Sequence, residues 1–355
     1  MSEASSKPPS EKPKRRPRYR GTHPRQFHEK YKELSPERYA EDVAKVLASG
    51  KTPAGMHRPI MVAEILEALA PKPGETAVDA TLGYGGHTTE LLRAIRPGGR
   101  VIALDVDPIE LPKTEARLRA NGFTGEELLV RRSNFAGLAG VLGAEGIDGV
   151  DMVLADLGLS SMQIDDPSRG FTFKRPGPLD LRMNPGRGQP ASALLATLDA
   201  PRLARMLEEN SDEPRAELLA REILAIQSRT PIVTTTALAE AVARALNNSP
   251  FQPARDQVDT TIRRVFQALR IAVNDEFSAL ETFLRHLPDC LKPGGRVAVL
   301  TFHSGEDRRV KKAFQEGARN GVYSGIAEEV RRPGNGELRA NPRSSSAKLR
   351  WAVRG

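Results

Sequence analysis

The chain has 355 residues, of which 39% are hydrophobic and 28% are charged, and its formal net charge is +8. These proportions are ordinary for a soluble globular protein. No apolar run reaches the roughly 20 residues of a membrane-spanning helix, and the N-terminal residues lack the apolar segment of a secretory signal. The single cysteine, Cys290, excludes a disulfide framework and a cysteine-based zinc site. We therefore expect a cytoplasmic protein with no membrane partner.

The positive charge is concentrated at the two ends of the chain. Residues 1–30 contain nine Lys or Arg and three Asp or Glu, and residues 331–355 contain seven and one. The 300 residues between them therefore carry a net charge of −4. Proline and the lack of periodicity predict that residues 1–50 form a disordered basic extension. Such an extension is either a solubilising tail or an arm that binds phosphate.

Strands that alternate with helices are predicted on both sides of a helical stretch. In chain order, the predicted elements are a helix over 57–69, a strand over 76–78, a helix over 88–95, a strand over 101–104, a helix near 109–120, strands near 127–131 and over 151–155, a strand over 296–301 and a terminal strand over 346–353. This alternation indicates an α/β protein of the Rossmann-like class, with a parallel-type sheet flanked by helices.

The composition changes at about residue 165. The predicted elements there are a loop over 165–190 that is rich in Pro, Gly and Arg, helices near 191–209, 214–228 and 235–247, and one long helix over 256–287. We therefore assign residues 51–164 and 260–355 to the main α/β domain and residues 165–259 to a helical insertion.

The most informative motif is Asp79-Ala-Thr-Leu-Gly-Tyr-Gly-Gly-His87, between a predicted strand and a predicted helix. The next strand ends in Asp105, about twenty residues after the glycines. This order is typical of a nucleotide-binding βαβ unit, in which glycines let the backbone approach the ligand and the acid binds ribose hydroxyls. The alternative is a tight turn of any α/β protein.

The charge and spacing of this motif favour one class of nucleotide ligand. The dinucleotide fingerprint needs a third glycine three positions after Gly85, where this chain has Thr88. Asp79, before the loop, would repel a phosphate but could attract the sulfonium or ammonium group of S-adenosylmethionine. The sequence therefore favours a methyl donor over a nicotinamide dinucleotide.

Two further polar clusters follow predicted strands. The loop that begins at Asp156 could orient an amine nucleophile through its carboxylate and hydroxyls, or it could be a serine-stabilised turn that leads into a helix. In the second cluster His303 could be a general base, although a hydrogen-bonded structural histidine is the simpler interpretation. Glu306 and Asp307 could form a solvated helix start.

Eight motifs occur in order and together resemble the RsmH (MraW) family. They are Gly83-Tyr-Gly-Gly-His87, Asp105-Val-Asp-Pro108, Asp156-Leu-Gly-Leu-Ser-Ser-Met-Gln-Ile-Asp165, Arg169-Gly-Phe-Thr-Phe173, Gly177-Pro-Leu-Asp-Leu-Arg-Met183, Phe266-Gln-Ala-Leu-Arg-Ile-Ala-Val-Asn274, Phe302-His-Ser304, and Asn341-Pro-Arg343 through Ala347-Lys-Leu-Arg350. The resemblance runs from about His57 to the C-terminus. Members of this family methylate N4 of a cytosine in the decoding region of 16S ribosomal RNA.

The resemblance implies a class I methyltransferase fold, S-adenosyl-L-methionine as the methyl donor, and 16S rRNA within the small ribosomal subunit as the partner. It implies that the helical insertion helps to bind RNA. Donor contacts are implied at Gly85, Gly86, His87, Asp105, Phe135, Asp156 and Gln163. Asp156 is the candidate catalytic residue, because acceptors on its loop could hold the N4 hydrogens of the cytosine. Direct methyl transfer requires no metal.

Three positions depart from the family pattern. Gly305 replaces a leucine, and we expect it to loosen that turn. Ser211-Asp-Glu-Pro214 replaces Gly-Glu-Glu-Arg, with Pro214 expected to start a helix, and Ser345 replaces an arginine. None of them falls on an implied donor contact. Two other functional classes stay open, a catalytically silent ribosome-assembly factor with this fold and a nicotinamide-dependent oxidoreductase.

Overall fold

The computed structural model describes residues 59–248 and 254–355. The basic extension predicted over residues 1–50 lies outside them. Within the described residues, no helix is both long enough and apolar enough to cross a bilayer.

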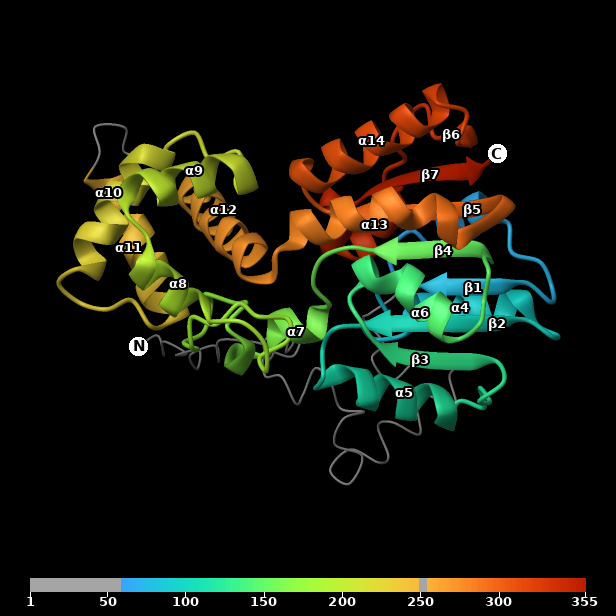
Figure 1. The fold of residues 1–355 in the computed structure, drawn as a ribbon. Helices are drawn as coiled ribbons and strands as arrows, with labels where there is room; N and C mark the ends of the chain where they lie inside the picture. Colours follow the sequence, from blue (N-terminus) through green and yellow to red (C-terminus); the bar gives the residue numbers. More distant parts are fainter. Residues whose placement is uncertain (1–58, 249–253) are drawn as a thin grey trace, which may run out of the picture. The chain divides into compact units, whose positions relative to one another are not determined.

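A seven-stranded sheet forms the centre of the α/β part, with the strand order β3-β2-β1-β4-β5-β7-β6 (Figure 1). The strands are β1 (Thr76–Asp79), β2 (Arg100–Asp105), β3 (Leu128–Arg132), β4 (Val150–Asp156), β5 (Leu291–Thr301), β6 (Tyr323–Ile326) and β7 (Lys348–Arg354). Strands β1 to β5 pair in parallel, as predicted. The terminal strand β7 instead runs antiparallel between β5 and β6, so the sheet is mixed.

Helices cover both faces of the sheet because each central strand is apolar on both sides. In β2, Val101 and Ala103 pack on one face and Ile102 and Leu104 on the other. The first face is covered by α3 (Val62–Leu69), α4 (Gly86–Ile95) and α5 (Glu110–Ala120). The second face is covered by α6 (Leu138–Ala144), α13 (Glu276–Cys290) and α14 (Ser304–Arg319). Cys290 is buried in this second layer, as expected for a core residue.

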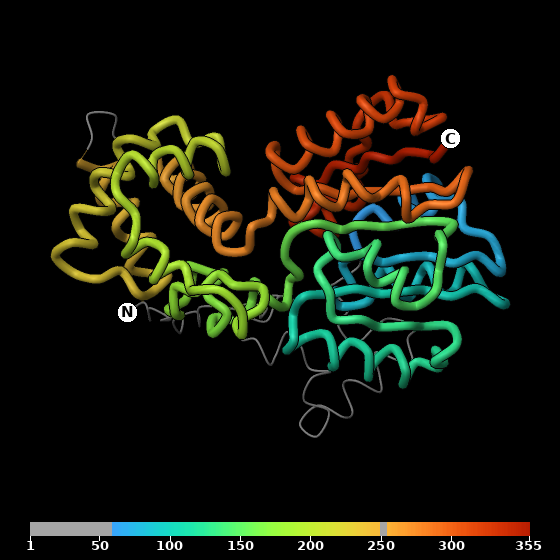
Figure 2. Tube along the Cα trace, in the orientation of Figure 1, coloured from blue at the N-terminus to red at the C-terminus, as the bar shows by residue number. Residues whose placement is uncertain are grey.

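The chain leaves the sheet after β4, forms the helical insertion and returns to β5 (Figure 2). The insertion contains α8 (Ala191–Thr197), α9 (Ala200–Ser211), α10 (Ala216–Gln227), α11 (Thr235–Asn247) and α12 (Arg255–Asn274). These helices pack on a core of their own, which includes Leu203, Leu219, Leu238 and Leu269. The predicted domain boundary at residue 259 falls inside α12, so the break belongs at one end of that helix.

Three predicted helices have different bounds in the structure. The single helix predicted over 256–287 is wrong, because Asp275 adopts a left-handed conformation (φ 51°) that ends α12 and starts α13. The helix predicted near 191–209 is two helices, because Asp199 accepts the Arg202 amide hydrogen and caps α9. The first predicted helix begins only at Val62, after Met61 in a left-handed conformation.

Gly305 lies in the first turn of α14 and does not loosen it. A Cβ atom at this position would lie 2.6 Å from the Phe277 ring. The guanidinium of Arg309 covers the same ring at 3.5 Å from its centroid, and the ring of His303 packs at 5.8 Å. The Phe277 ring therefore occupies the space next to the helix that a leucine at position 305 would need.

We expect Gly305→Leu to lower the free energy of unfolding by about 1–3 kcal/mol, the range of an overpacked core. The cost should fall in a Phe277→Ala background, because the removed ring makes room for the leucine. Urea unfolding of the two single variants and the double variant gives the coupling energy. Additive effects of the two substitutions would contradict this explanation of the departure.

Candidate functional site

A cavity lies at the carboxyl ends of the central parallel strands. Strands β2 and β4 both pair with β1, so the loops that follow these three strands meet at one edge of the sheet. Six of the seven implied donor contacts line this cavity, namely Gly86, His87, Asp105, Phe135, Asp156 and Gln163. Gly85 does not line it. A side chain at Gly85 would point at Thr114 and Leu118. Gly85 is instead the residue that precedes α4, and it has a positive φ of 75°, which favours glycine.

Backbone amides of two loops hold the carboxylate of Asp105. The Gly83 N–H donates to Oδ2 at 2.8 Å, and the Asp107 N–H donates to Oδ1 at 2.9 Å. Burial raises the pKa of Asp105 to about 6, although these two hydrogen bonds lower it. Each carboxylate oxygen can accept more than one hydrogen bond, so the side chain can still receive ribose hydroxyls from the cavity.

His87 and Asp156 face each other across the wall of the cavity, with 3.4 Å between Nε2 and Oδ2. Burial lowers the pKa of His87, but the carboxylates of Asp156 and Asp79 raise it above its ordinary value. Within the described residues, His87 Nε2 and Asp156 Oδ1 are buried and have no hydrogen-bond partner. The Asp156 side chain as a whole is 28% exposed, so the carboxylate still offers the cavity an acceptor.

Asp79 does not line the cavity, contrary to the reasoning that placed it beside a cationic ligand. It is buried, and its carboxylate accepts hydrogen bonds from the Thr88 hydroxyl at 2.6 Å and the Thr81 N–H at 3.1 Å. Burial raises its pKa. The acids that do line the cavity are Asp105, Asp156, Glu276 and Glu306, and Arg343 lines it too. Because Arg270 pairs with Glu276, the preference for a cationic ligand rests on Asp105 and Asp156.

The loop after Asp156 turns into the short helix α7 (Ser161–Asp165) through a capping box. The Ser160 hydroxyl accepts the Gln163 N–H at 3.3 Å, and the Gln163 side-chain oxygen accepts the Ser160 N–H at 2.9 Å. The other end of the Gln163 amide donates to Asp107 at 2.8 Å. The loop is thus a serine-stabilised turn that leads into a helix, and it also presents the Asp156 carboxylate to the cavity.

Residues 54–354 match the model of the MraW methylase family. The chain belongs to this family. It is 52% identical over 345 residues to "Ribosomal RNA small subunit methyltransferase H 2" of Alkaliphilus metalliredigens, a match that covers 97% of this chain and 98% of that relative. It is 51% identical over 342 residues to "Ribosomal RNA small subunit methyltransferase H 1" of Lachnoclostridium phytofermentans, covering 96% and 93%. The predicted resemblance is confirmed, and the nicotinamide-dependent alternative is wrong.

The wall of the methylase cavity opposite the glycine loop, which we call the far wall, was not predicted from the sequence. Met183 and Asn274 line it, and the Asn274 side chain holds the segment before Met183. Its amide donates to the Leu181 carbonyl at 2.7 Å and accepts the Met183 N–H at 2.8 Å. Both residues lie in motifs that carry the family resemblance, and that position was the only signal the sequence offered.

The cluster after β5 is structural in this methylase. His303 Nδ1 accepts the Glu306 N–H and caps α14, which fits the simpler interpretation of this histidine. Glu306 and Asp307 are buried, so the predicted solvated helix start is wrong. Burial raises the pKa of Glu306, but the larger combined effect of His303 and Arg270 lowers it, so the pKa lies below its ordinary value.

One group of described residues has the composition of a metal site. Ligand atoms of Glu276, His303 and Glu306 lie within 4.8 Å of one another. Both carboxylate oxygens of Glu276, however, accept hydrogen bonds from the Arg270 guanidinium at 2.8 and 2.9 Å. Because a guanidinium already neutralises this acid, the group fits a polar wall of the cavity better than a cation site.

We expect the affinity for S-adenosylhomocysteine to be constant well above pH 6, to be about halved at pH 6 and to fall further below it. The ribose hydroxyls of the ligand are expected to bind the ionised form of Asp105, whose pKa is about 6, so protonation competes with binding. The fall approaches tenfold per pH unit, since one proton is taken up. Calorimetric titrations from pH 5 to pH 8 measure this dependence.

Asp105→Asn is the matched control, since an amide does not titrate. Its affinity should be at least tenfold weaker at pH 8, the scale of one or two lost charge-assisted hydrogen bonds, and it should lose the fall below pH 6. The same fall in Asp105→Asn would assign the titration to another group.

Proposed function

We propose that this methylase transfers the methyl group of S-adenosylmethionine to N4 of a cytosine in the decoding region of 16S ribosomal RNA. The observation that carries the proposal is the Asp156 carboxylate, which lines the cavity beside the glycine loop and lies 3.4 Å from His87 Nε2. The names of the relatives, small subunit ribosomal RNA methyltransferases, support the assignment of the substrate.

The chain's own residues would provide alignment and proton acceptance. S-adenosylmethionine supplies an electrophilic methyl carbon and a thioether leaving group when it is bound. Asp105 holds the ribose, and Phe135, whose edge packs on Phe283 at 5.5 Å, gives the cavity an aromatic wall. Six of the donor contacts implied by the resemblance, Gly86, His87, Asp105, Phe135, Asp156 and Gln163, form one side of this arrangement.

Asp156 has the central role in the proposed chemistry. The lone pair of a cytosine N4 is delocalised into the ring, so the amine is a poor nucleophile. The Asp156 carboxylate accepts an N4 hydrogen, which localises the lone pair toward the methyl carbon. The N–C bond forms as the C–S bond breaks, and the N4 proton passes to Asp156 and then to water.

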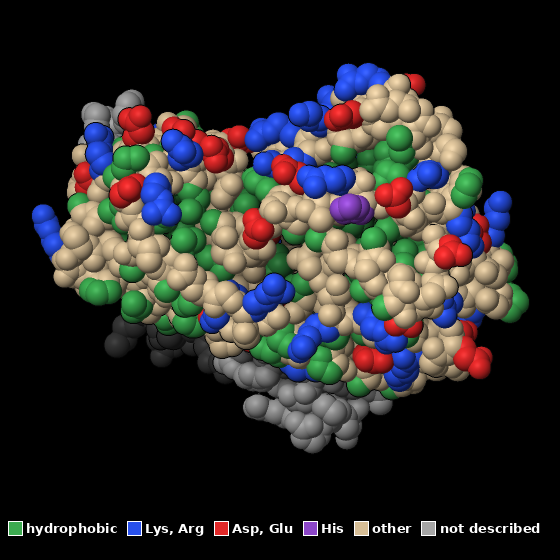
Figure 3. All heavy atoms as spheres, in the orientation of Figure 1, with side chains coloured by type: hydrophobic (Ala, Val, Ile, Leu, Met, Phe, Trp, Pro, Cys, Tyr) green, Lys and Arg blue, Asp and Glu red, His purple; other side chains and the backbone are tan. Residues whose placement is uncertain are grey.

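Exposed positive charge on α14 suits a polyanionic substrate. In Figure 3, Lys and Arg side chains gather over α14, where Lys311, Lys312 and Arg319 are exposed. Such side chains bind phosphates without reading sequence. We propose that the cavity and the helical insertion select the cytosine, and that the RNA is bound as part of the small ribosomal subunit.

We expect Asp156→Asn to slow single-turnover methyl transfer to unmodified small subunits by about 10² or more at saturating donor, the scale of a lost proton acceptor and oriented charge. Asp151→Asn is the matched control. Asp151 lies on the same strand outside the cavity, where it binds the Thr76 N–H and Lys292, so this variant should keep the parental rate.

Full activity of Asp156→Asn would remove Asp156 from the chemistry. A parent protein that binds S-adenosylmethionine but transfers no methyl group to any form of the subunit would be a silent assembly factor.

A further inference from the structure

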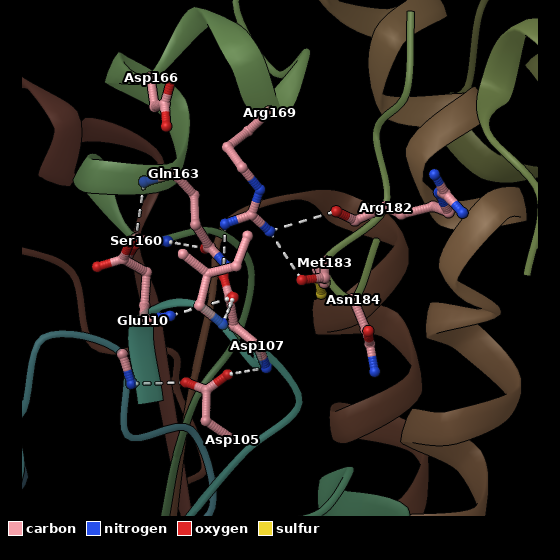
Figure 4. Close-up of polar contacts among 12 residues, drawn as sticks. Asp105, Asp107, Glu110, Ser160, Gln163, Asp166, Arg169, Arg182, Met183 and Asn184 are labelled. Atoms are coloured by element: carbon pink, nitrogen blue, oxygen red, sulfur yellow. Dashed lines mark hydrogen bonds and ion pairs between the residues drawn. The ribbon is translucent and has the colours of Figure 1, made fainter. Parts of the chain in front are cut away.

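A buried arginine links the donor side of the cavity to its far wall (Figure 4). The side chains of Arg169 and Asp107 are 7% and 1% exposed, and Arg169 Nη1 donates to Asp107 Oδ2 at 2.7 Å. The other terminal nitrogen, Nη2, donates to the backbone carbonyls of Met183 at 2.8 Å and Arg182 at 3.4 Å. One planar guanidinium therefore joins two loops that are far apart in the sequence.

On the donor side, Asp107 fixes the backbone that orients Asp105. Its Oδ1 accepts the Ile109 and Glu110 N–H groups at the start of α5, and its Oδ2 also accepts the Gln163 amide. The Asp107 N–H itself donates to Asp105 Oδ1. A shift of Asp107 would therefore move a hydrogen bond that holds the proposed ribose-binding carboxylate.

On the far wall, the partners of Arg169 belong to a strained segment. Leu181 has φ of 64°, a left-handed conformation that is costly for a bulky residue. The Asn274 hydrogen bonds to the Leu181 carbonyl and the Met183 N–H, together with those from Arg169, hold residues 181–183 in this conformation. Strain of this kind persists where surrounding contacts impose it, often at binding sites.

We infer that Arg169 is a positioning residue that couples the two sides of the cavity. A donor that fixes Asp105 also fixes Asp107, and through Arg169 it fixes the wall at residues 181–183 against which the acceptor base must lie. Donor binding therefore strengthens substrate binding, and by linkage the substrate strengthens donor binding by the same factor. The inference rests on the proposed function, since it takes this cavity to hold both donor and base.

The test measures the affinity for small subunits that lack the methyl group, with and without saturating S-adenosylhomocysteine. In the parent protein, the ligand should tighten subunit binding at least fivefold, a typical coupling between sites. In Arg169→Gln, S-adenosylhomocysteine should change subunit affinity by less than twofold. Arg169→Lys keeps the charge but cannot reach the carboxylate and both carbonyls as a fork, so its factor should also fall.

Arg296→Gln is the matched control. Arg296 likewise joins a carboxylate, Glu75, to two backbone carbonyls, those of Leu69 and Ala70. It lies where β5 pairs with the start of β4, at the end of the sheet away from the cavity. Its loss should lower stability and leave the coupling factor unchanged, which separates positioning from the general loss of an arginine–carboxylate pair.

A coupling factor of one in the parent protein, or the parental factor in folded Arg169→Gln or Arg169→Lys, would overturn the inference. If Arg169→Gln does not fold, the lysine variant decides the test. Methyl transfer by the parent protein is measured in parallel. Transfer without coupling would refute the role of Arg169 and leave the proposed function standing, whereas a parent that binds no donor would refute both.

Discussion

Parallel pairing of β1, β2 and β4 places three aspartates, Asp79, Asp105 and Asp156, at the same edge of the sheet. Burial is the largest cause of the raised pKa of Asp79 and of Asp105, and neighbouring carboxylates add to it, Asp156 for Asp79 and Asp79 for Asp105. Hydrogen bonds from the surrounding loops oppose this effect, and a cationic ligand would oppose it too.

The three aspartates have different surroundings and therefore different roles. Asp79 is buried behind the glycine loop and is bound by a threonine hydroxyl. Asp105 is held by two backbone amides and remains available at the cavity wall. Asp156 faces His87 and retains one unsatisfied oxygen. The structural acid, the proposed donor-binding acid and the proposed proton acceptor are therefore distinguished by their surroundings rather than by residue type.

Much of the fold and of the donor side could be predicted from sequence, because strand ends and glycine turns are local signals. The order of Gly83, Gly85 and Asp105 predicts which loops meet, since parallel strands place their carboxyl ends together. The burial of Asp79 could not be predicted, because it depends on a hydroxyl nine residues later. Until the conformation of the glycine loop is known, Asp79 before the loop is expected to be as accessible to a ligand as Asp105 after it.

The far wall shows the limit of such reasoning more clearly. Arg169 meets Asp107 across 62 residues, and nothing in local pattern pairs one arginine with one aspartate at that separation. The break at Asp275 is equally hidden, because the sequence there contains neither glycine nor proline and the helical periodicity continues on both sides. The contact between Phe277 and Gly305 is likewise tertiary, so the reason for a glycine at position 305 is visible only in the folded structure.

The central claim is that this edge of the sheet directs a methyl group to an exocyclic amine of a cytosine. The most direct measurement incubates the full chain with isotopically labelled S-adenosylmethionine and unmodified small subunits, digests the RNA to nucleosides and identifies the labelled product by mass spectrometry. We expect label in N4-methylcytidine alone. Label in a ring-carbon-methylated or ribose-methylated nucleoside would contradict it.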